Sequence, residues 1–296
     1  MIEAGDLKRA FERFQSDEMT QRAAALTYYS LLSLFPALLF GVAVLGFFGQ
    51  ESLIRDAADY LKTAGAPRET VDAVTSALQS AQSERGTALG ALVLGLATAL
   101  YGASGAFGAA GSALNQIWRV QEGRGFVKHK LHNLIWTLVL MLLVLITCVL
   151  VFLGGGLAGD VLGLIGLGDS FAAVWRIARW PAALLSAMLI YAIVYYAAPN
   201  VEIRHWKYIT PGAVLGVALW IAASAGFFVY VSSFSSYSAT YGAFTAVVIL
   251  LIWLWLTNSA LLFGAELNAV VDQRRARNLP PGYDGPVLPP KEPADA

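Results

Sequence analysis

Few residues in this 296-residue sequence can support metal or nucleophilic chemistry. The histidines are His129 and His132, three positions apart, and His205, so a metal site would have to be assembled from two separate segments. No histidine falls inside a long apolar run, where it could activate a serine. The single cysteine, Cys148, excludes a disulfide or a cysteine-based zinc site within one chain. We therefore expect no catalytic residue, no metal and no cofactor.

One glycine cluster imitates a nucleotide-binding motif. Residues 154–159 read Gly-Gly-Gly-Leu-Ala-Gly and are followed by Asp160. A dinucleotide-binding turn needs a preceding strand and a following helix. Here the cluster closes an apolar run and more glycines follow it, so we interpret it as a flexible loop.

Polar groups within or beside the apolar runs are the more informative candidates, because each costs free energy in an apolar medium unless it is paired or hydrated. Arg22 precedes the first run and Glu266 comes near the end of the last. The full set of candidates is Arg22, Tyr28, Tyr29, Ser30, Asn115, Asn258, Glu266 and Asn268.

The composition indicates the elements that must position these groups. Hydrophobic residues make up 57% of the chain and charged residues 14%, with a mean hydropathy of +0.60. Soluble proteins carry roughly a quarter charged residues, so this composition is typical of a membrane protein. Lys plus Arg equal Asp plus Glu, 20 each. The resulting zero net charge argues against nucleic acid as a partner.

We predict an all-α fold, a polytopic bundle of six transmembrane helices. Each run is long enough to cross a bilayer, and none has the alternating polarity of a barrel strand. Pro181 and Pro211 are expected to start the fourth and fifth helices. The predicted spans are Ala23–Phe48, Thr87–Ile117, Asn133–Gly155, Pro181–Ala198, Thr210–Val231 and Gly242–Glu266.

The loop charges predict the orientation. Fourteen Lys and Arg residues fall in the two termini and the second and fourth loops, and six fall in the first and third. Because basic residues are retained in the cytoplasm, both termini are expected inside. The second loop would then place His129 and His132, flanked by Lys128 and Lys130, near lipid headgroups.

Three extramembrane segments complete the predicted organisation around a membrane domain of residues 22–269. In residues 1–21, apolar positions recur at helical spacing (Leu7, Ala10, Phe11, Phe14), which suits a helix lying in the membrane interface, or else a solvated helix packed on a loop. Residues 50–86 are expected to form an external helical hairpin. Residues 270–296 are proline-rich and expected to be disordered.

The topology places Arg22, Asn115 and Glu266 at a similar depth on the cytoplasmic side. We therefore predict an Arg22–Glu266 salt bridge, either as a structural clamp between the first and last helices or as a gating or substrate-binding pair. Pro36 removes a backbone hydrogen bond and is expected to kink the first span.

Small residues in the second span predict close helix packing. Glycine recurs every third residue there, which leaves a groove that a neighbouring backbone can approach. A hinge at a substrate site is the alternative. The groove consists of Gly102, Gly105, Gly108 and Gly111.

Several motifs, in order, resemble those of the YihY/BrkB family of bacterial inner-membrane proteins. The first is the run from Arg22 to Pro36. Later ones are Leu114–Trp118, Pro199-Asn200, Pro211–Ala213, Ser235–Ser238 with Tyr241-Gly242, and Gly264–Ala269. Ala198 stands where the family pattern has leucine.

The resemblance implies six helices and an inner-membrane location, and it carries over no active site. Members were long labelled ribonuclease BN, a misassignment, and some are associated with virulence or envelope lipid export. Our leading hypothesis is a non-enzymatic protein that moves or handles an amphipathic envelope molecule such as a lipid, with membrane lipids as its partners. A scaffold or assembly factor and a membrane enzyme are the alternatives, and a homo-oligomer or an envelope-protein partner is left open.

Overall fold

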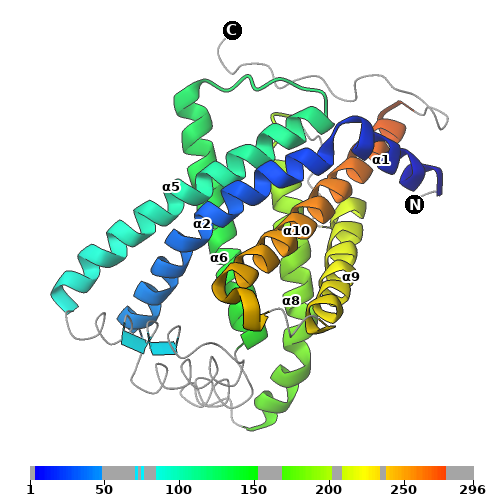
Figure 1. The fold of residues 1–296 in the computed structure, drawn as a ribbon. Coiled ribbons are helices and arrows are strands. Elements are labelled where there is room, and N and C mark those ends of the chain that lie inside the picture. The colour runs from blue at the N-terminus through cyan, green and yellow to red at the C-terminus, as the bar shows by residue number, and fades with distance from the viewer. Residues whose placement is uncertain are drawn as a thin grey trace. The chain divides into compact units, whose positions relative to one another are not determined.

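The computed structural model describes residues 4–48, 71–72, 75–76, 85–152, 169–201, 209–233 and 238–277. Across these ranges the regular elements are α-helices, which confirms the predicted all-α class. They are α1 (Ala4–Ser16), α2 (Met19–Phe48), α5 (Arg85–Ile117), α6 (Phe126–Phe152), α8 (Asp169–Ala197), α9 (Pro211–Ser233) and α10 (Ser238–Arg277) (Figure 1).

Each long helix overlaps one of the predicted spans. Four contain a stretch that is long and apolar enough to cross a membrane: Phe126–Thr147, Ile177–Ala197, Pro211–Val231 and Val247–Arg274. This confirms a membrane protein. The spans predicted at α2 and α5 stay predictions, and most of the predicted hairpin at 50–86 lies outside the described residues.

The chain divides into two compact units, residues 28–106 and residues 1–27 with 107–296. In the larger unit the helices pack in the order α6, α8, α9, α10 and α1, each on the next. In the smaller unit α2 packs on α5, because a side chain at Gly105 would contact the ring of Tyr29 at 3.6 Å. Figure 1 shows α2 and α5 running side by side.

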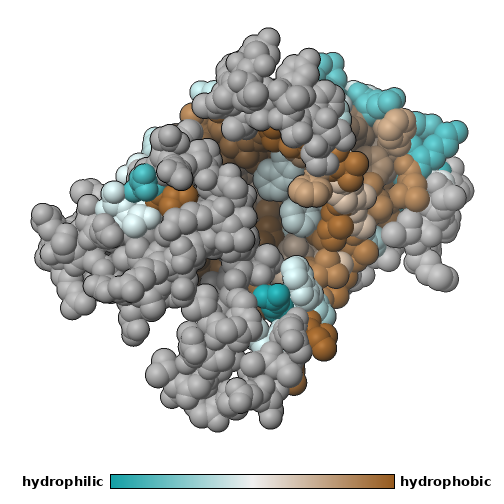
Figure 2. Space-filling model, turned by 60° about the horizontal axis from the view of Figure 1, so that its bottom comes forward, coloured by the Kyte–Doolittle hydropathy of each residue, from teal (hydrophilic) through white to brown (hydrophobic). Residues whose placement is uncertain are grey.

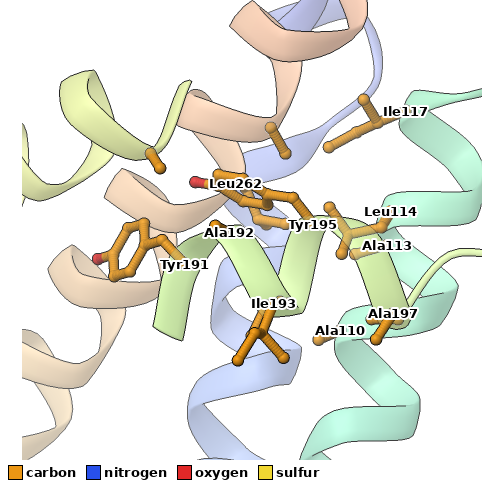
Figure 3. Close-up of a cluster of buried hydrophobic side chains, with 14 of the residues drawn as sticks. Ala110, Ala113, Leu114, Ile117, Tyr191, Ala192, Ile193, Tyr195, Ala197 and Leu262 are labelled. Carbon is orange, nitrogen blue, oxygen red and sulfur yellow. The ribbon is translucent and has the colours of Figure 1, made fainter. Parts of the chain in front are cut away.

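The core of the larger unit surrounds the end of α8. Tyr195 is almost fully buried, and its hydroxyl donates a hydrogen bond of 2.7 Å to the Leu261 carbonyl of α10. Figure 3 shows Tyr195 beside Leu262, with Leu114 and Ala113 of α5 on the other side. Alanines in this cluster, such as Ala113 of α5 and Ala192 and Ala197 of α8, let the helices approach closely.

Two prolines were predicted to start helices, and the prediction is confirmed for Pro211 and wrong for Pro181. Pro211 is the first residue of α9, and the Thr210 hydroxyl caps the helix by accepting the Ala213 N–H at 3.0 Å. Pro181, predicted to begin the fourth span, instead lies inside α8, which starts at Asp169. A membrane helix tolerates an internal proline because neighbouring groups satisfy the freed carbonyl.

Other helices extend past their apolar runs. The third span was predicted from Asn133, whereas α6 begins at Phe126 because Lys128 to His132 do not interrupt a helix. At the other end of the chain, α10 continues to Arg277, into the segment predicted as a tail; residues 278–296 lie outside the described residues. Pro36 lies within α2, and its kink stays a prediction.

Much of the membrane-span surface is apolar and exposed. Phe228 and Val229 of α9, Ile177 of α8 and Ile135 of α6 are all exposed. Figure 2 shows apolar side chains over much of the described surface on one face. Such a surface suits contact with lipid tails.

Candidate functional site

Two ion pairs attach α1 to α10. The Asp6 carboxylate lies 3.3 Å from the Arg274 guanidinium, and Arg13 Nε lies 3.2 Å from Glu266 Oε2. The Asp6 side chain is 2% exposed and that of Glu266 is 0% exposed. Arg13 also donates a hydrogen bond of 2.6 Å from Nη2 to the Ile117 carbonyl at the end of α5. These contacts clamp three helix ends together.

The predicted apolar stripe of α1 is divided between two faces. Ala10 is buried and the Phe14 ring packs on Phe263 of α10, with ring centroids 5.7 Å apart. Leu7 and Phe11 are exposed. The face of α1 toward α10 therefore carries the charges, and two of its apolar side chains point away from α10.

The predicted Arg22–Glu266 salt bridge is wrong in its basic partner, since Glu266 pairs with Arg13. The cause is a tight turn between α1 and α2, in which Glu18 has a positive φ of 54° and the Asp17 N–H donates to the Arg13 carbonyl. This turn folds α1 back, so Arg13 reaches Glu266. Arg22 is half-buried on α2.

A usable signal for the clamp was present in the sequence. Asp6 and Arg13 stand seven positions apart, and Glu266 and Arg274 stand eight apart. These spacings put each pair on one helix face. On both helices the acid precedes the base, so opposite charges can pair only if the helices run antiparallel. Sequence analysis overlooked this pairing because it treated α1 as a surface helix.

A second polar cluster joins the turn after α5 to the end of α8. Asn115 Oδ1 accepts the Asn200 N–H at 2.6 Å, and Asn115 Nδ2 donates to Glu122 at 3.3 Å. Arg124 donates two short hydrogen bonds to Glu122, at 2.6 and 2.7 Å, and a third to the Ala198 carbonyl. Two of the motifs noted in the sequence, those with Asn115 and Asn200, thus meet directly.

The two histidines of this loop have separate protein contacts. His129 Nε2 accepts a hydrogen bond from Asn133, and its Nδ1 lies 3.3 Å from Glu122. His132 Nε2 lies 2.7 Å from the Ala197 carbonyl and donates to it. In the described residues no three His, Cys, Asp or Glu side chains are grouped to hold a metal ion. His205 lies outside those residues.

Glu122 is held in its charged form. Partial burial raises its pKa, but the hydrogen bonds and charge of Arg124, together with the charge of His129, outweigh burial and bring the pKa below its ordinary 4.5. The hydrogen bonds between the turn and Glu122 therefore stabilise the protein fully at pH values above the ordinary pKa of 4.5. This stabilisation is lost as the pH falls through the lower pKa that Glu122 has in the folded protein.

This shift predicts a local pH response. Because the Arg124 N–H donates to Glu122 at 3.0 Å, hydrogen-exchange protection of that amide should be constant at neutral pH and should fall once Glu122 is protonated. Glu122→Gln should remove the pH dependence. The Ala198 amide, bonded to the Val194 carbonyl, is the internal control. Equal pH responses of the two amides would contradict the prediction.

The predicted glycine groove is filled by this chain. A side chain at Gly108 would meet Asn133 at 2.9 Å, and one at Gly111 would meet the Ala198 carbonyl at 2.8 Å. Gly105 contacts Tyr29, as described above, and Gly102 is half-buried. Three of the four glycines therefore serve contacts within the protein.

Asn268 and Asn258 each tie α10 to another helix. Asn268 Oδ1 accepts the Gly212 N–H at 2.7 Å, and its Nδ2 donates to the Thr210 hydroxyl at 3.0 Å. Asn258 donates to the Thr27 hydroxyl at 3.2 Å. Each candidate asparagine within α10 thus has a protein partner near a helix contact.

The candidate residues of the smaller unit are more exposed. Tyr28 and Tyr29 are 59% and 41% exposed, with ring centroids 5.4 Å apart, and Ser30 is half-buried. Tyr101 of α5 is 68% exposed. Tyr101 and Gly105 share a helix face, being four residues apart, and Gly105 contacts the Tyr29 ring. The smaller unit therefore gathers exposed tyrosines along α2 and α5.

Comparison with known proteins decides the family. A family model described as "Virulence factor BrkB" matches residues 10–284. The chain belongs to the BrkB family. The resemblance noted from the sequence motifs is thereby confirmed, and these BrkB motifs supply the contacts of Asn115 with Asn200, Gly212 with Asn268, and Glu266 with Arg13.

Similar BrkB relatives come from several bacteria. The "Putative ribonuclease-like protein YfkH" of Bacillus subtilis is 31% identical over 91% of this chain and 96% of its own length. A "UPF0761 membrane protein" of Alkalilimnicola ehrlichii is 33% identical over 87% of this chain, which covers 56% of that protein. One from Aeromonas salmonicida is 27% identical over 89% of this chain and 87% of its own length. No solved structure matches.

Proposed function

We propose that this BrkB-family protein moves or handles an amphipathic envelope molecule, most simply a lipid, in the bacterial inner membrane. The exposed tyrosines of α2 and α5 carry the proposal. Tyr101 stands midway between Arg85 and Ile117, the ends of α5, so a spanning α5 would hold it near the bilayer centre. A tyrosine side chain exposed at that depth places a polar group among the lipid tails.

The buried polar groups also support a lipid, and not an ion, as the molecule that is handled. Asn115, Asn258 and Asn268 are bonded to other groups of the protein. They are therefore poor candidates for stripping the hydration shell from an ion. The exposed side chains of Tyr28, Tyr29 and Tyr101 instead suit a lipid headgroup, which brings its own apolar tails into the membrane.

Reconstitution tests this function. Full-length protein in phospholipid vesicles should speed the exchange of fluorescent lipids between leaflets. Tyr28→Phe, Tyr29→Phe and Tyr101→Phe together should slow that exchange, and Tyr230→Phe, an exposed tyrosine near the end of α9, should not. A wild-type protein with no effect on lipid movement would contradict the proposal, and an unchanged triple variant would remove the tyrosines from it.

A scaffold or assembly factor is the alternative. Its predicted interface was the glycine groove of α5, and this chain's own Tyr29, Asn133 and Ala198 contact that groove. The remaining apolar helix faces would have to bind the partner. Lipid movement by purified protein alone would count against this alternative.

The proposal includes an orientation, with both termini and the loop at Arg119–Lys130 in the cytoplasm. The warrant is the excess of Lys and Arg in those segments. After Cys148 is replaced, a cysteine at Gln79 should react with an impermeant reagent from the periplasm. Labelling at Gln79 from the cytoplasmic side alone would reverse the orientation.

We also propose that the protein is not a nuclease and does not bind nucleic acid. Support comes from the zero net charge and from the chemistry of hydrolysis, which would call for a metal-binding cluster of acids or histidines. Purified protein should not cleave RNA with added Mg²⁺ or Mn²⁺. Cleavage that an acidic-to-amide substitution abolishes would contradict this expectation.

A further inference from the structure

The first turn of α6 exposes apolar side chains beside the polar turn that follows α5. Phe126 is 85% exposed and Val127 is 76% exposed, the highest values among the large apolar residues that the structure describes. The preceding turn is fixed by the hydrogen bonds of Arg124 to Glu122. The fold therefore holds two apolar side chains outward at the point where α6 begins.

Val127 is the first member of an exposed apolar stripe along α6. The members recur every three or four residues, so they share one helix face. They are Val127, Leu131, Ile135, Leu138, Leu142 and Leu145. The other face packs on the protein, since His132 bonds to the Ala197 carbonyl of α8 and Asn133 bonds to His129. One side of α6 thus contacts its neighbours and the other contacts the surrounding medium.

The stripe is nearly as long as a bilayer core is thick. Val127 and Leu145 are 18 residues apart, or about 27 Å at 1.5 Å per residue, and the hydrocarbon core measures roughly 30 Å. A stripe that fills this core puts Val127 at its edge. Lys128 and Lys130 then lie at the level of the lipid headgroups, which long lysine side chains near a helix end reach readily.

The two lysines flank the stripe. At about 100° per residue, Lys128 and Lys130 lie on opposite sides of Val127, the first exposed and the second half-buried. The sequence of α6 contains no Asp or Glu, and Glu122 before it is paired with Arg124. Cationic groups on both sides of an apolar stripe match an anionic phospholipid, whose charged headgroup sits above apolar tails.

We propose that residues 126–131 bind the headgroup of an anionic phospholipid where α6 enters the bilayer. Lys128 and Lys130 contact the phosphate, and Val127 and Leu131 contact the first part of the acyl chains. The bound molecule is a resident lipid on the outside of the bundle. The site therefore goes beyond the proposed movement of lipid and does not depend on it.

Depth labelling tests where the bilayer surface lies on α6. After Cys148 is replaced, full-length protein carrying a spin label at Val127→Cys is placed in vesicles of phosphatidylcholine and phosphatidylglycerol. The label should collide more often with oxygen, which concentrates in hydrocarbon, than with a water-soluble nickel complex. A label at Gln121→Cys, exposed in the polar turn, should show the opposite order. Dominant collisions with nickel at Val127 would overturn the proposal and leave this surface to a soluble protein partner.

Fluorescence quenching tests the preference for an anionic headgroup. A fluorophore at Ile135→Cys lies on the same stripe, about 12 Å along α6 from Val127. Acyl-brominated phosphatidylglycerol should quench it more strongly than acyl-brominated phosphatidylcholine at the same mole fraction. Lys128→Gln combined with Lys130→Gln should lower this preference by up to about fivefold for each lysine. High salt should lower the preference as well, because it screens exposed charges.

Two variants control for charge and for place. Lys128→Arg combined with Lys130→Arg should keep the preference, because both charges remain. Lys8→Gln, which removes an exposed lysine of α1, should keep it too. Equal quenching by the two lipids in the wild type, or an unchanged preference in the double glutamine variant, would overturn the proposal. Both experiments locate lipid at equilibrium, so a protein that fails to move lipid between leaflets would still give the expected results.

Discussion

Gly212→Ala is expected to prevent stable packing of α9 on α10. The added methyl group would overlap the Gly264 carbonyl oxygen and would lie 2.6 Å from Cγ of Asn268. A backbone carbonyl cannot rotate away as a side chain can, so the helices would have to separate and lose the Gly212–Asn268 hydrogen bond. Overpacking usually costs 1–3 kcal/mol, and we expect a loss of about 3 kcal/mol or more here.

Gly226→Ala provides a control on the same helix. No atom lies within 4 Å of a side chain added at Gly226, and alanine is the better helix former by roughly 1 kcal/mol. Thermal unfolding in detergent should therefore show a large decrease in melting temperature for Gly212→Ala and none for Gly226→Ala. Similar melting temperatures for the two variants would show that the α9–α10 contact is looser than described.

The second large effect is expected from the buried Arg13–Glu266 pair. Arg13→Ala leaves the Glu266 carboxyl group buried without its cation and leaves the Ile117 carbonyl without its donor. Removing one partner of a buried pair costs about 3–5 kcal/mol, and removing both is less damaging than the sum of the single losses. The double variant should therefore be more stable than additivity predicts.

An exposed pair on α1 is the matched comparison. Lys8 and Glu12 lie 3.7 Å apart, with both side chains more than half exposed, and exposed pairs contribute little because water screens them. The cycle of Lys8→Ala, Glu12→Ala and their double variant should be close to additive. An equally additive cycle for Arg13 and Glu266 would mean that water solvates each charge separately, and the clamp would have to be abandoned.

Local sequence patterns predicted the helices but not their contacts. Apolar runs long enough for a bilayer predicted where four candidate spans lie, and Pro211 predicted the start of α9. The boundaries failed at Pro181 and Phe126, where the helix continues beyond the apolar run. The apolar run in the sequence reflects only the part of a helix that contacts lipid. The helix itself continues as far as its backbone hydrogen bonds do.

The site was harder to predict because its partners come from distant segments. Glu266 was recognised as a costly buried charge, but its cation depends on the turn at Glu18, whose positive φ no local pattern indicated. Asn115 and Asn200 were noted as separate motifs, and their contact follows from the packing of α5 on the end of α8. Tyr28 and Tyr29 were predicted as membrane-depth polar groups, and their exposure depends on tertiary packing.

The length of α10 has a mechanical consequence. Its 40 residues make a rod of about 60 Å at 1.5 Å per residue, twice the roughly 30 Å of a hydrocarbon core. The same rod therefore carries membrane-embedded residues such as Trp253 and, toward its far end, the charges that hold α1. Because Glu266 and Arg274 of this helix pair with Arg13 and Asp6, a tilt of α10 in response to bilayer thickness would move α1 with it.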